Sequence, residues 1–318
     1  MGKIVFPNTD PLLDPAFASH EAQRCLPDQI ALLQELRDHL RDLIKRAFGQ
    51  HKDSVHDLVV IGGLSKQALV ALDGLCICLE AGAAHAGHIQ ARAQWEATLF
   101  VEWILQNGRE RWGRQYYVAD IRRVRNSTRR AIIGTPENAA YQELWRETYE
   151  KEPNEFSEEF VKKASEHLAE IDRILARPIY STINLEFEES VKKRDGREPD
   201  WWFQPGGPKS IYDMAKALGR RTEYVILYGY WSGLAHGTRH APHFKHYSGS
   251  VELEPVRYVP LFPELLRPMF PITARLIRQL TETYRHGELP QMTEKYLRQW
   301  RPRFQVPDIE AQVEHVRF

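Results

Sequence analysis

Apolar residues recur at steps of three and four along most of this chain, the spacing that places side chains on one face of an α-helix. Residues 28–48 show the pattern most clearly, through Ile30, Leu33, Leu36, Leu40 and Leu43. Alternation of apolar and polar residues is weak and confined to residues 248–260, which could form a small β-hairpin. Because strands do not alternate with helices along the sequence, the pattern argues against an α/β fold. It predicts an all-α, multi-helix bundle.

The chain has 318 residues, enough for one large or two ordinary domains. Four prolines predict an irregular N-terminal arm over residues 1–27. We expect a single helical domain over residues 28–288, followed by a C-terminal tail over residues 289–318. Within the domain, the periodicity predicts helices over residues 54–79, 84–105, 109–130, 157–175 and 264–284.

Composition narrows the protein class. Hydrophobic residues make up 42% of the chain and charged residues 27%, which is typical of a folded globular protein. The 43 basic residues balance the 43 acidic ones, so a strongly basic nucleic-acid binder is disfavoured for the chain as a whole, although local patches remain open. The cysteines lack the spacing of a disulfide framework and fit reduced thiols.

Nothing in the sequence predicts a membrane protein. The N-terminus lacks the basic and apolar regions of a secretory signal. The most apolar segment, residues 58–84, is interrupted by Lys66, Asp73 and Glu80, so we interpret it as a buried helix and not a membrane span. We therefore expect a cytoplasmic protein without a membrane partner.

An unusual polar stripe marks residues 224–236. Tyr224, Tyr228, Ser232 and His236 stand four residues apart, which places them on one helix face where a packing helix would carry Leu, Ile or Ala. The loop after this helix contains four further basic side chains, Arg239, His240, His243 and His246. The stripe and the loop together predict a functional site.

The histidines of this loop could in principle bind zinc, which takes three or four ligands in a fixed geometry. Residues 233–251 contain no Asp, Glu or Cys to complete such a site. The alternative is a solvated loop whose histidines only titrate. We predict no metal ligand and no cofactor.

A second polar stripe, His88, Arg92 and Glu96, lies on a helix whose other residues are mostly small or apolar. A charged pair inside a buried helix is costly unless it is satisfied. Two interpretations stay open: Arg92 and Glu96 form a salt bridge on a surface strip, or they form a buried polar spine. In the second case the spine faces the stripe of Tyr228, Ser232 and His236.

The order and spacing of these stripes resemble a widespread family of bacterial helical proteins that is known only as a domain of unknown function. Its recurring marks are Arg-x-x-x-Glu on one helix and Tyr-x-x-x-Ser-x-x-x-His at a later helix end. This chain matches those marks at Arg92, Glu96, Tyr228, Ser232 and His236. The resemblance covers residues 54–246 and implies a helical fold in an intracellular bacterial setting, but no established activity.

More distantly, the chain resembles the HEPN helical bundles, many of which are metal-independent ribonucleases of toxin and phage-defence systems. Their mark is an Arg followed, after four to six residues, by a His at a helix end. Arg239 and His246 have six residues between them, and Arg46 and His51 have four. The resemblance implies that His moves protons at the ribose 2′-hydroxyl or the leaving oxygen, while Arg stabilises phosphate charge.

Residues 109–130 are rich in arginine, and aromatic residues interleave with the arginines. This pattern is typical of RNA contact through phosphate binding and base stacking, which we expect of Arg122, Arg123 and Arg125. The alternative is a solvated helix face paired with the acidic residues 143–159. The later run Trp201, Trp202 and Phe203 is either a lid over the site or a plug that seals the bundle.

The hypothesis that follows is metal-independent RNA cleavage in a defence or toxin setting. His236 or His246 would move protons, Arg239 or Arg92 would hold the phosphate, and Glu96 would orient a histidine. Further binding side chains are Tyr228, Ser232, His240 and His243. The alternative is a non-enzymatic helical module that binds a protein partner or a nucleotide, or that forms a homo-oligomer.

Overall fold

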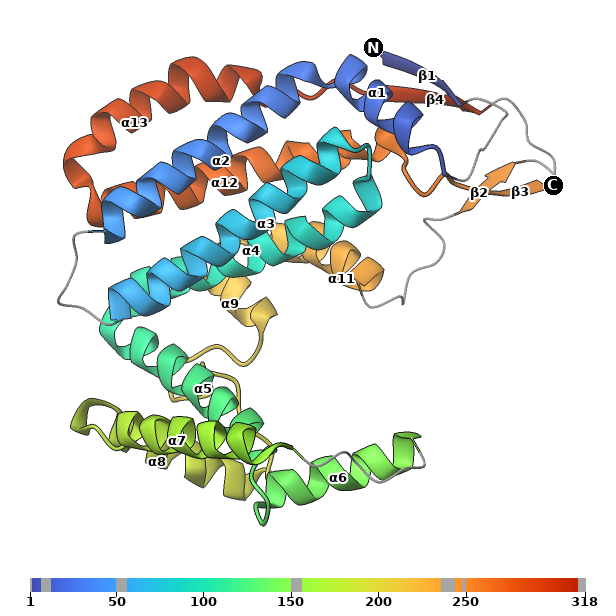
Figure 1. Cartoon of the computed structure of the whole chain (residues 1–318). Coiled ribbons are helices and arrows are strands. Elements are labelled where there is room, and N and C mark those ends of the chain that lie inside the picture. The colour runs from blue at the N-terminus through green and yellow to red at the C-terminus, as the bar shows by residue number, and fades with distance from the viewer. Residues whose placement is uncertain are drawn as a thin grey trace. The chain divides into compact units, whose positions relative to one another are not determined.

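The computed structural model describes residues 2–6, 13–49, 56–149, 156–235, 244–247 and 250–313. The fold is all-α, as the sequence predicts, and within these described ranges the strands form only short two-stranded ribbons (Figure 1). The chain forms two compact units, one from Met1–Gln106 with Ser210–Phe318 and the other from Asn107–Lys209. The single domain expected over residues 28–288 stays a prediction.

The first unit contains the long helices of the chain's two ends. From the N-terminal part come α1 Pro15–Cys25, α2 Pro27–Phe48, the π-helix η1 His56–Ile61, α3 Gly62–Glu80 and α4 Ala84–Asn107. From the later part come α9 Ile211–Ala217, α10 Arg221–Glu223, the π-helix η2 Tyr224–Tyr228, α11 Gly229–Ala235, η4 Val259–Leu261, α12 Phe262–Tyr284, η5 His286–Glu288, α13 Leu289–Lys295, η6 Tyr296–Trp300 and η7 Arg301–Phe304.

Helix α2 is central to the first unit, because it packs against both α3 and α12 (Figure 1). Its periodic leucines Leu33, Leu36, Leu40 and Leu43 are fully buried, as the three- and four-residue spacing predicts. Their burial draws together helices that lie more than two hundred residues apart in sequence. The apolar stripe of one helix therefore organises this unit.

The N-terminal arm expected to be irregular contains helix α1, which corrects that prediction. Pro15 occupies the first turn, and the Asp14 side chain caps the helix by accepting a hydrogen bond from the Phe17 N–H at 2.9 Å. Proline fits the first turn because the N–H it lacks would have no intrahelical partner there. The prolines that we interpreted as breakers mark helix starts at Pro15 and again at Pro27.

The apolar segment over Leu58–Glu80 is long and apolar enough to cross a membrane by length and composition, and 44% of its most apolar window is buried inside the protein. The buried face of α3 includes Leu72, Leu75 and Cys76, and this helix packs against α2. Burial raises the pKa of the Cys76 thiol to about 12, so the thiol stays protonated.

The second unit consists of α5 Arg109–Arg129, α6 Pro136–Tyr149, α7 Glu158–Leu175 and α8 Pro178–Lys193. Helix α8 does not follow from the sequence pattern, because charged residues separate its apolar positions Tyr180 and Phe187, which are buried. Trp201 is buried against Trp112 and Tyr116, with ring centroids 6.2 and 5.3 Å apart. This aromatic run is therefore a plug in the core of the second unit and not a lid.

Two short ribbons complete the fold. Strand β2 Phe244–Tyr247 pairs antiparallel with β3 Ser250–Leu253, so the hairpin forms earlier than the predicted residues 248–260. Strand β1 Gly2–Phe6 pairs in parallel with β4 Ile309–Val313. The second ribbon joins distant parts of the sequence, and strands that short give no periodic signal.

Candidate functional site

The polar stripe lies on a helix that contains a π-turn. Helices α10, η2 and α11 follow one another without a break, and the Gly229 N–H bonds to the Tyr224 carbonyl five residues back. A π-turn adds a residue to the helix and shifts the faces that follow it, a feature often seen at functional sites. The π-turn at Tyr224–Tyr228 therefore interrupts the four-residue spacing from which the stripe was predicted.

Arg92 of α4 contacts this helix directly. Its Nη2 donates to the Tyr228 hydroxyl at 3.3 Å, and its Cζ lies 5.1 Å from the centre of the Tyr228 ring. Nε and Nη2 also donate to Glu96 Oε1 at 3.4 and 3.3 Å, one turn along α4. The two stripes therefore face each other at Tyr228, as the polar-spine interpretation expects.

The Arg92–Glu96 pair is neither on the surface nor fully buried. The exposed fraction is 18% for the Arg92 side chain and 27% for that of Glu96. Burial disfavours the charge on Arg92, but Glu96 and Tyr228 outweigh that effect and raise the pKa of the guanidinium. Burial, together with the Glu96 carboxylate, raises the pKa of Tyr228 to about 12. At neutral pH the cluster thus holds a fixed cation beside a neutral hydroxyl.

Trp95 forms the apolar side of this cluster. Its ring lies 5.0 Å from that of Tyr228 and 6.3 Å from that of Tyr224. Its indole N–H donates to Glu223 Oε2 at 2.8 Å. Sequence reasoning missed both Trp95 and Glu223, because a tryptophan in an apolar helix indicates only core packing.

Three contacts show how α4 runs relative to the helix formed by α10, η2 and α11. Trp95 lies against Tyr224, Arg92 against Tyr228, and His88 against Tyr230, with the last two rings 5.5 Å apart. The helices are therefore antiparallel, and the end of α11 approaches the start of α4. Glu96 lies toward the other end, where its carboxylate holds Arg92 and no described histidine. Because the side chains of the predicted catalytic histidines lie outside the described part of the structure, the expected role of Glu96 in orienting one of them stays a prediction.

His88 is the buried histidine at the end of the cluster. Its side chain is fully buried, and burial, reinforced by nearby His85, lowers its pKa to about 4. The two imidazole centroids are 6.5 Å apart. At neutral pH His88 is uncharged. The sequence placed His88 on the polar stripe but gave it no role in the site.

Much of the predicted catalytic loop lies outside the described residues, namely His236, Arg239, His240 and His243. His246 is in strand β2, opposite Val251 of β3, and Ser232 is half-buried on α11. The described residues hold no group of three or more His, Cys, Asp or Glu side chains that could bind a metal ion. The catalytic and binding roles of these residues stay predictions.

Arg122 is placed differently from its expected role in RNA contact. Its side chain is 5% exposed and donates from Nε and Nη2 to Glu198 at 3.1 and 2.8 Å. Its Nη1 donates to Asn184 Oδ1 at 2.6 Å. These contacts use its donors inside the second unit, so Arg122 holds that unit together and offers nothing to a phosphate.

The neighbouring arginines differ in exposure. Arg125 pairs with Asp172 of α7 at 3.0 Å and with Glu188 of α8 at 3.5 Å. Arg123 has a side chain that is 56% exposed, and Asp120 lies 3.9 Å from it. The acidic partners of Arg122 and Arg125 thus come from α7, α8 and the segment after α8, and not from the predicted residues 143–159. Of the three arginines, Arg123 is the most open to solvent.

Comparison with known proteins places the chain in a family. No curated protein and no solved structure matches it significantly. A family model matches residues 58–249, more than half of the chain, and includes both Arg92 and Tyr228. The chain therefore belongs to DUF5677, a family of unknown function.

Proposed function

We propose that this protein cleaves RNA without a metal ion, at the face where α4 meets η2 and α11. The observation that carries the proposal is the 3.3 Å contact between Arg92 Nη2 and the Tyr228 hydroxyl, across 136 positions of sequence. It places a permanently charged guanidinium beside the helix that leads directly into His236. An intracellular bacterial defence or toxin role belongs to the same proposal.

The chemistry needs a base, an acid and a cation. The base removes the proton from the ribose 2′-hydroxyl, whose oxygen attacks the adjacent phosphorus. The acid protonates the departing 5′-oxygen, which leaves a 2′,3′-cyclic phosphate on the upstream product. Arg92 would stabilise the charge that develops on the phosphate oxygens, and His236 or His246 would move the protons.

The contacts of Arg92 support its assigned part. Glu96 and Tyr228 fix the guanidinium from two sides, so little side-chain freedom is lost when a phosphate binds. Tyr228 keeps its hydroxyl proton at neutral pH, because its pKa is raised to about 12. It therefore serves as a neutral positioning group and not as the general base.

The test uses purified full-length protein and a single-stranded RNA oligonucleotide, with and without EDTA. We expect cleavage that EDTA does not change, products ending in a cyclic phosphate, and no cleavage of a substrate with 2′-deoxyribose. His236→Gln and Arg92→Gln should each lower the rate by about 100-fold. Glu294→Gln, a substitution at an exposed position on α13, is the matched control, and this variant should cleave RNA at the wild-type rate. Cleavage that depends on a metal, or equal rates in all variants, would contradict the proposal.

The second candidate is a non-enzymatic module that binds a protein partner or a nucleotide. The observation in its favour is that Arg92 already donates hydrogen bonds to Glu96 and Tyr228, as expected of a polar cluster with a structural role. Binding of labelled RNA at several salt concentrations separates the candidates. RNA handling is favoured by saturable binding in which the logarithm of the binding constant falls against the logarithm of salt concentration, with a slope of about −0.7 per phosphate contact. Absence of binding at about 50 mM salt favours the module.

A further inference from the structure

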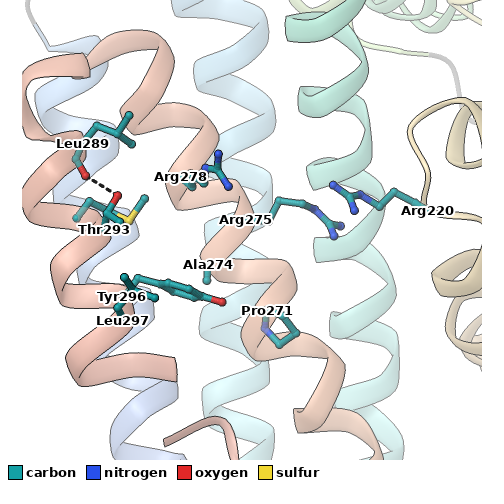
Figure 2. Close-up of a pocket in the computed structure, with 10 residues that line it drawn as sticks. Arg220, Pro271, Ala274, Arg275, Arg278, Leu289, Thr293, Tyr296 and Leu297 are labelled. Atoms are coloured by element: carbon teal, nitrogen blue, oxygen red, sulfur yellow. Dashed lines mark hydrogen bonds between the residues drawn. The ribbon is translucent and has the colours of Figure 1, made fainter. Parts of the chain in front are cut away.

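A pocket of about 530 Å³ lies on the face of α12 in the first unit, and Arg92, Glu96 and Tyr228 are not among its lining residues. Its volume falls within the range of roughly 300–1,000 Å³ that is common for small-molecule sites. Its floor and one end come from Pro271, Ala274, Arg275, Arg278 and Arg220 (Figure 2). Its other wall comes from α13 and η6, through Leu289, Met292, Thr293, Tyr296 and Leu297.

Small residues keep the floor of the pocket open. Pro271, Ala274, Arg275 and Arg278 recur at steps of three, one and three, which places them on one face of α12. Ala274 carries only a methyl group at the centre of this face, and Pro271 lies one turn before it. The two arginines are therefore the only charged groups that α12 contributes to the lining.

Two carboxylates behind the pocket hold Arg220 and Arg275. Glu102 is 1% exposed and accepts from Arg220 Nε and Nη2 at 3.3 and 2.8 Å. Glu223 accepts from Arg275 Nη1 and Nη2 at 2.6 and 2.8 Å, and Arg275 Nε lies 3.3 Å from Glu102. Gly219, which directly precedes Arg220, has a φ of 72°, a left-handed conformation that glycine adopts without strain.

These contacts leave positive charge for a ligand. Glu102 uses Nε and Nη2 of Arg220 but not Nη1. Arg278 is 69% exposed, and the nearest carboxylate, Glu282, is 4.0 Å away and itself mostly exposed. Three arginines thus line the pocket against two buried or half-buried carboxylates. Guanidinium groups held in place in this way favour an oxyanion, because their donors match its geometry.

The opposite wall is apolar and aromatic. Leu289, Met292 and Leu297 line it, and the Tyr296 side chain extends across the pocket toward Pro271 and Ala274 (Figure 2). An aromatic ring beside aliphatic side chains favours a flat, apolar ligand body. We propose that this pocket binds a small molecule that joins a planar aromatic body to a phosphate or carboxylate group. This site is separate from the proposed site of RNA cleavage.

Calorimetric titration of the full-length protein with three naphthalene compounds tests the pocket. 1-Naphthyl phosphate, 1-naphthoate and 1-naphthol share one ring system and differ in the attached group, and inorganic phosphate serves as the anion without a ring. We expect saturable binding of one or both anionic compounds, at least about tenfold tighter than that of naphthol or of inorganic phosphate. The tighter of the two anions identifies phosphate or carboxylate as the preferred group. Equal affinity for all three naphthalene compounds, or no saturable binding, overturns the proposal.

Matched variants locate the binding. Arg278→Gln should weaken binding of the preferred anion by about tenfold, because one guanidinium is lost. Arg298→Gln, on the neighbouring η6 but outside the lining, is the control and should bind like wild type. Thr293→Trp fills the pocket from an exposed position and should abolish binding. Arg92→Gln should leave binding unchanged, so failure here and failure of the proposed RNA cleavage are distinguishable. Equal binding by Arg278→Gln and Arg298→Gln would overturn the assignment.

Discussion

Trp95 donates its indole N–H to Glu223 at 2.8 Å, across 128 positions of sequence. Glu223 also accepts two hydrogen bonds from Arg275, which lines the pocket on α12. The Trp95 ring also lies at a tilt against the ring of Tyr228, whose hydroxyl accepts a hydrogen bond from Arg92. Direct contacts therefore run from Arg92 through Tyr228, Trp95 and Glu223 to Arg275. The polar cluster and the pocket share one supporting network.

Trp95→Phe tests this central link. The substitution keeps a buried ring but removes the N–H, so Glu223 loses one of its donors. We expect the free energy of unfolding to fall by about 1.5–3 kcal/mol, the usual cost of a lost hydrogen bond to a charged group. Urea denaturation followed by far-ultraviolet circular dichroism measures it. Trp145→Phe on the second unit's α6 is the control and should change stability by less than about 0.5 kcal/mol.

Glu102→Gln tests the buried end of the network. It leaves Arg220 and Arg275 beside a neutral amide inside the protein. Removal of one partner from a buried ion pair costs about 3–5 kcal/mol. The exposed pair of Glu294 and Arg298, 3.0 Å apart on one helix face, provides the comparison, and Glu294→Gln should cost less than about 1 kcal/mol. Similar midpoints of thermal unfolding for the two variants would contradict the burial argument.

Arg92→Ala should lower the free energy of unfolding by less than Glu102→Gln does. Both Arg92 and Glu96 retain some contact with solvent, so Glu96 is not left as an isolated buried charge. We expect a loss of about 1 kcal/mol in unfolding free energy, toward the value for exposed pairs. A loss as large as that of Glu102→Gln would show that the cluster is desolvated in solution. Because the variant should stay folded, its RNA-cleavage rate remains interpretable.

The parts of the site that the sequence predicts are those with local spacing. Arg92 and Glu96 are one helical turn apart, so their pairing follows from the sequence alone, and Tyr228 follows from the complementary stripe. The hydrogen bonds between Glu223 and Arg275 cannot be predicted from local spacing. Arg275 lies on an amphipathic helix with no unusual spacing, and only tertiary packing brings it to Glu223.

In the fold, too, features set by local spacing were predicted and features set by tertiary packing were not. Long apolar periodicities predicted α2, α4 and α12 closely, because burial of one face determines where such helices run. Helix α1 was missed because its proline lies at the helix start, and α8 because charged residues dominate it. The partners of Arg122 were missed for a third reason. Its acceptors on α8 and at Glu198 are more than sixty residues away, and no local pattern selects them.

Arg122→Ala and Arg123→Gln should separate structural from exposed arginines on α5. Loss of Arg122 removes a buried side chain and its hydrogen bonds to Glu198, but Glu198 keeps some contact with solvent, so the second unit should lose about 1.5–3 kcal/mol of stability. Arg123→Gln removes an exposed side chain and should cost less than about 0.5 kcal/mol. Limited proteolysis of the second unit and its thermal melting both report the difference. If RNA binds this helix, Arg123→Gln and not Arg122→Ala is the variant that tests it without unfolding.

Stability should fall as the pH is lowered from about 6.5 to about 4, and His88 should account for part of the loss. Burial lowers the pKa of His88 in the folded state to about 4, whereas a histidine in the unfolded chain titrates near 6.5. Between these values the unfolded chain binds a proton that the folded protein does not, so stability rises with pH there. One such group contributes a slope of about 1.4 kcal/mol per pH unit.

His88→Phe keeps a buried ring and removes the titration, so the slope of unfolding free energy against pH should fall by about 1.4 kcal/mol per unit between pH 4.5 and 6. His39, whose pKa burial also lowers to about 4, should continue to produce a slope in the variant. The exposed His20, changed to Gln, is the control and should leave the slope unchanged. Urea unfolding at half-unit pH intervals gives the slopes. If His88→Phe and wild type lose stability in parallel over this range, His88 is not the neutral buried group that its position on α4 indicates.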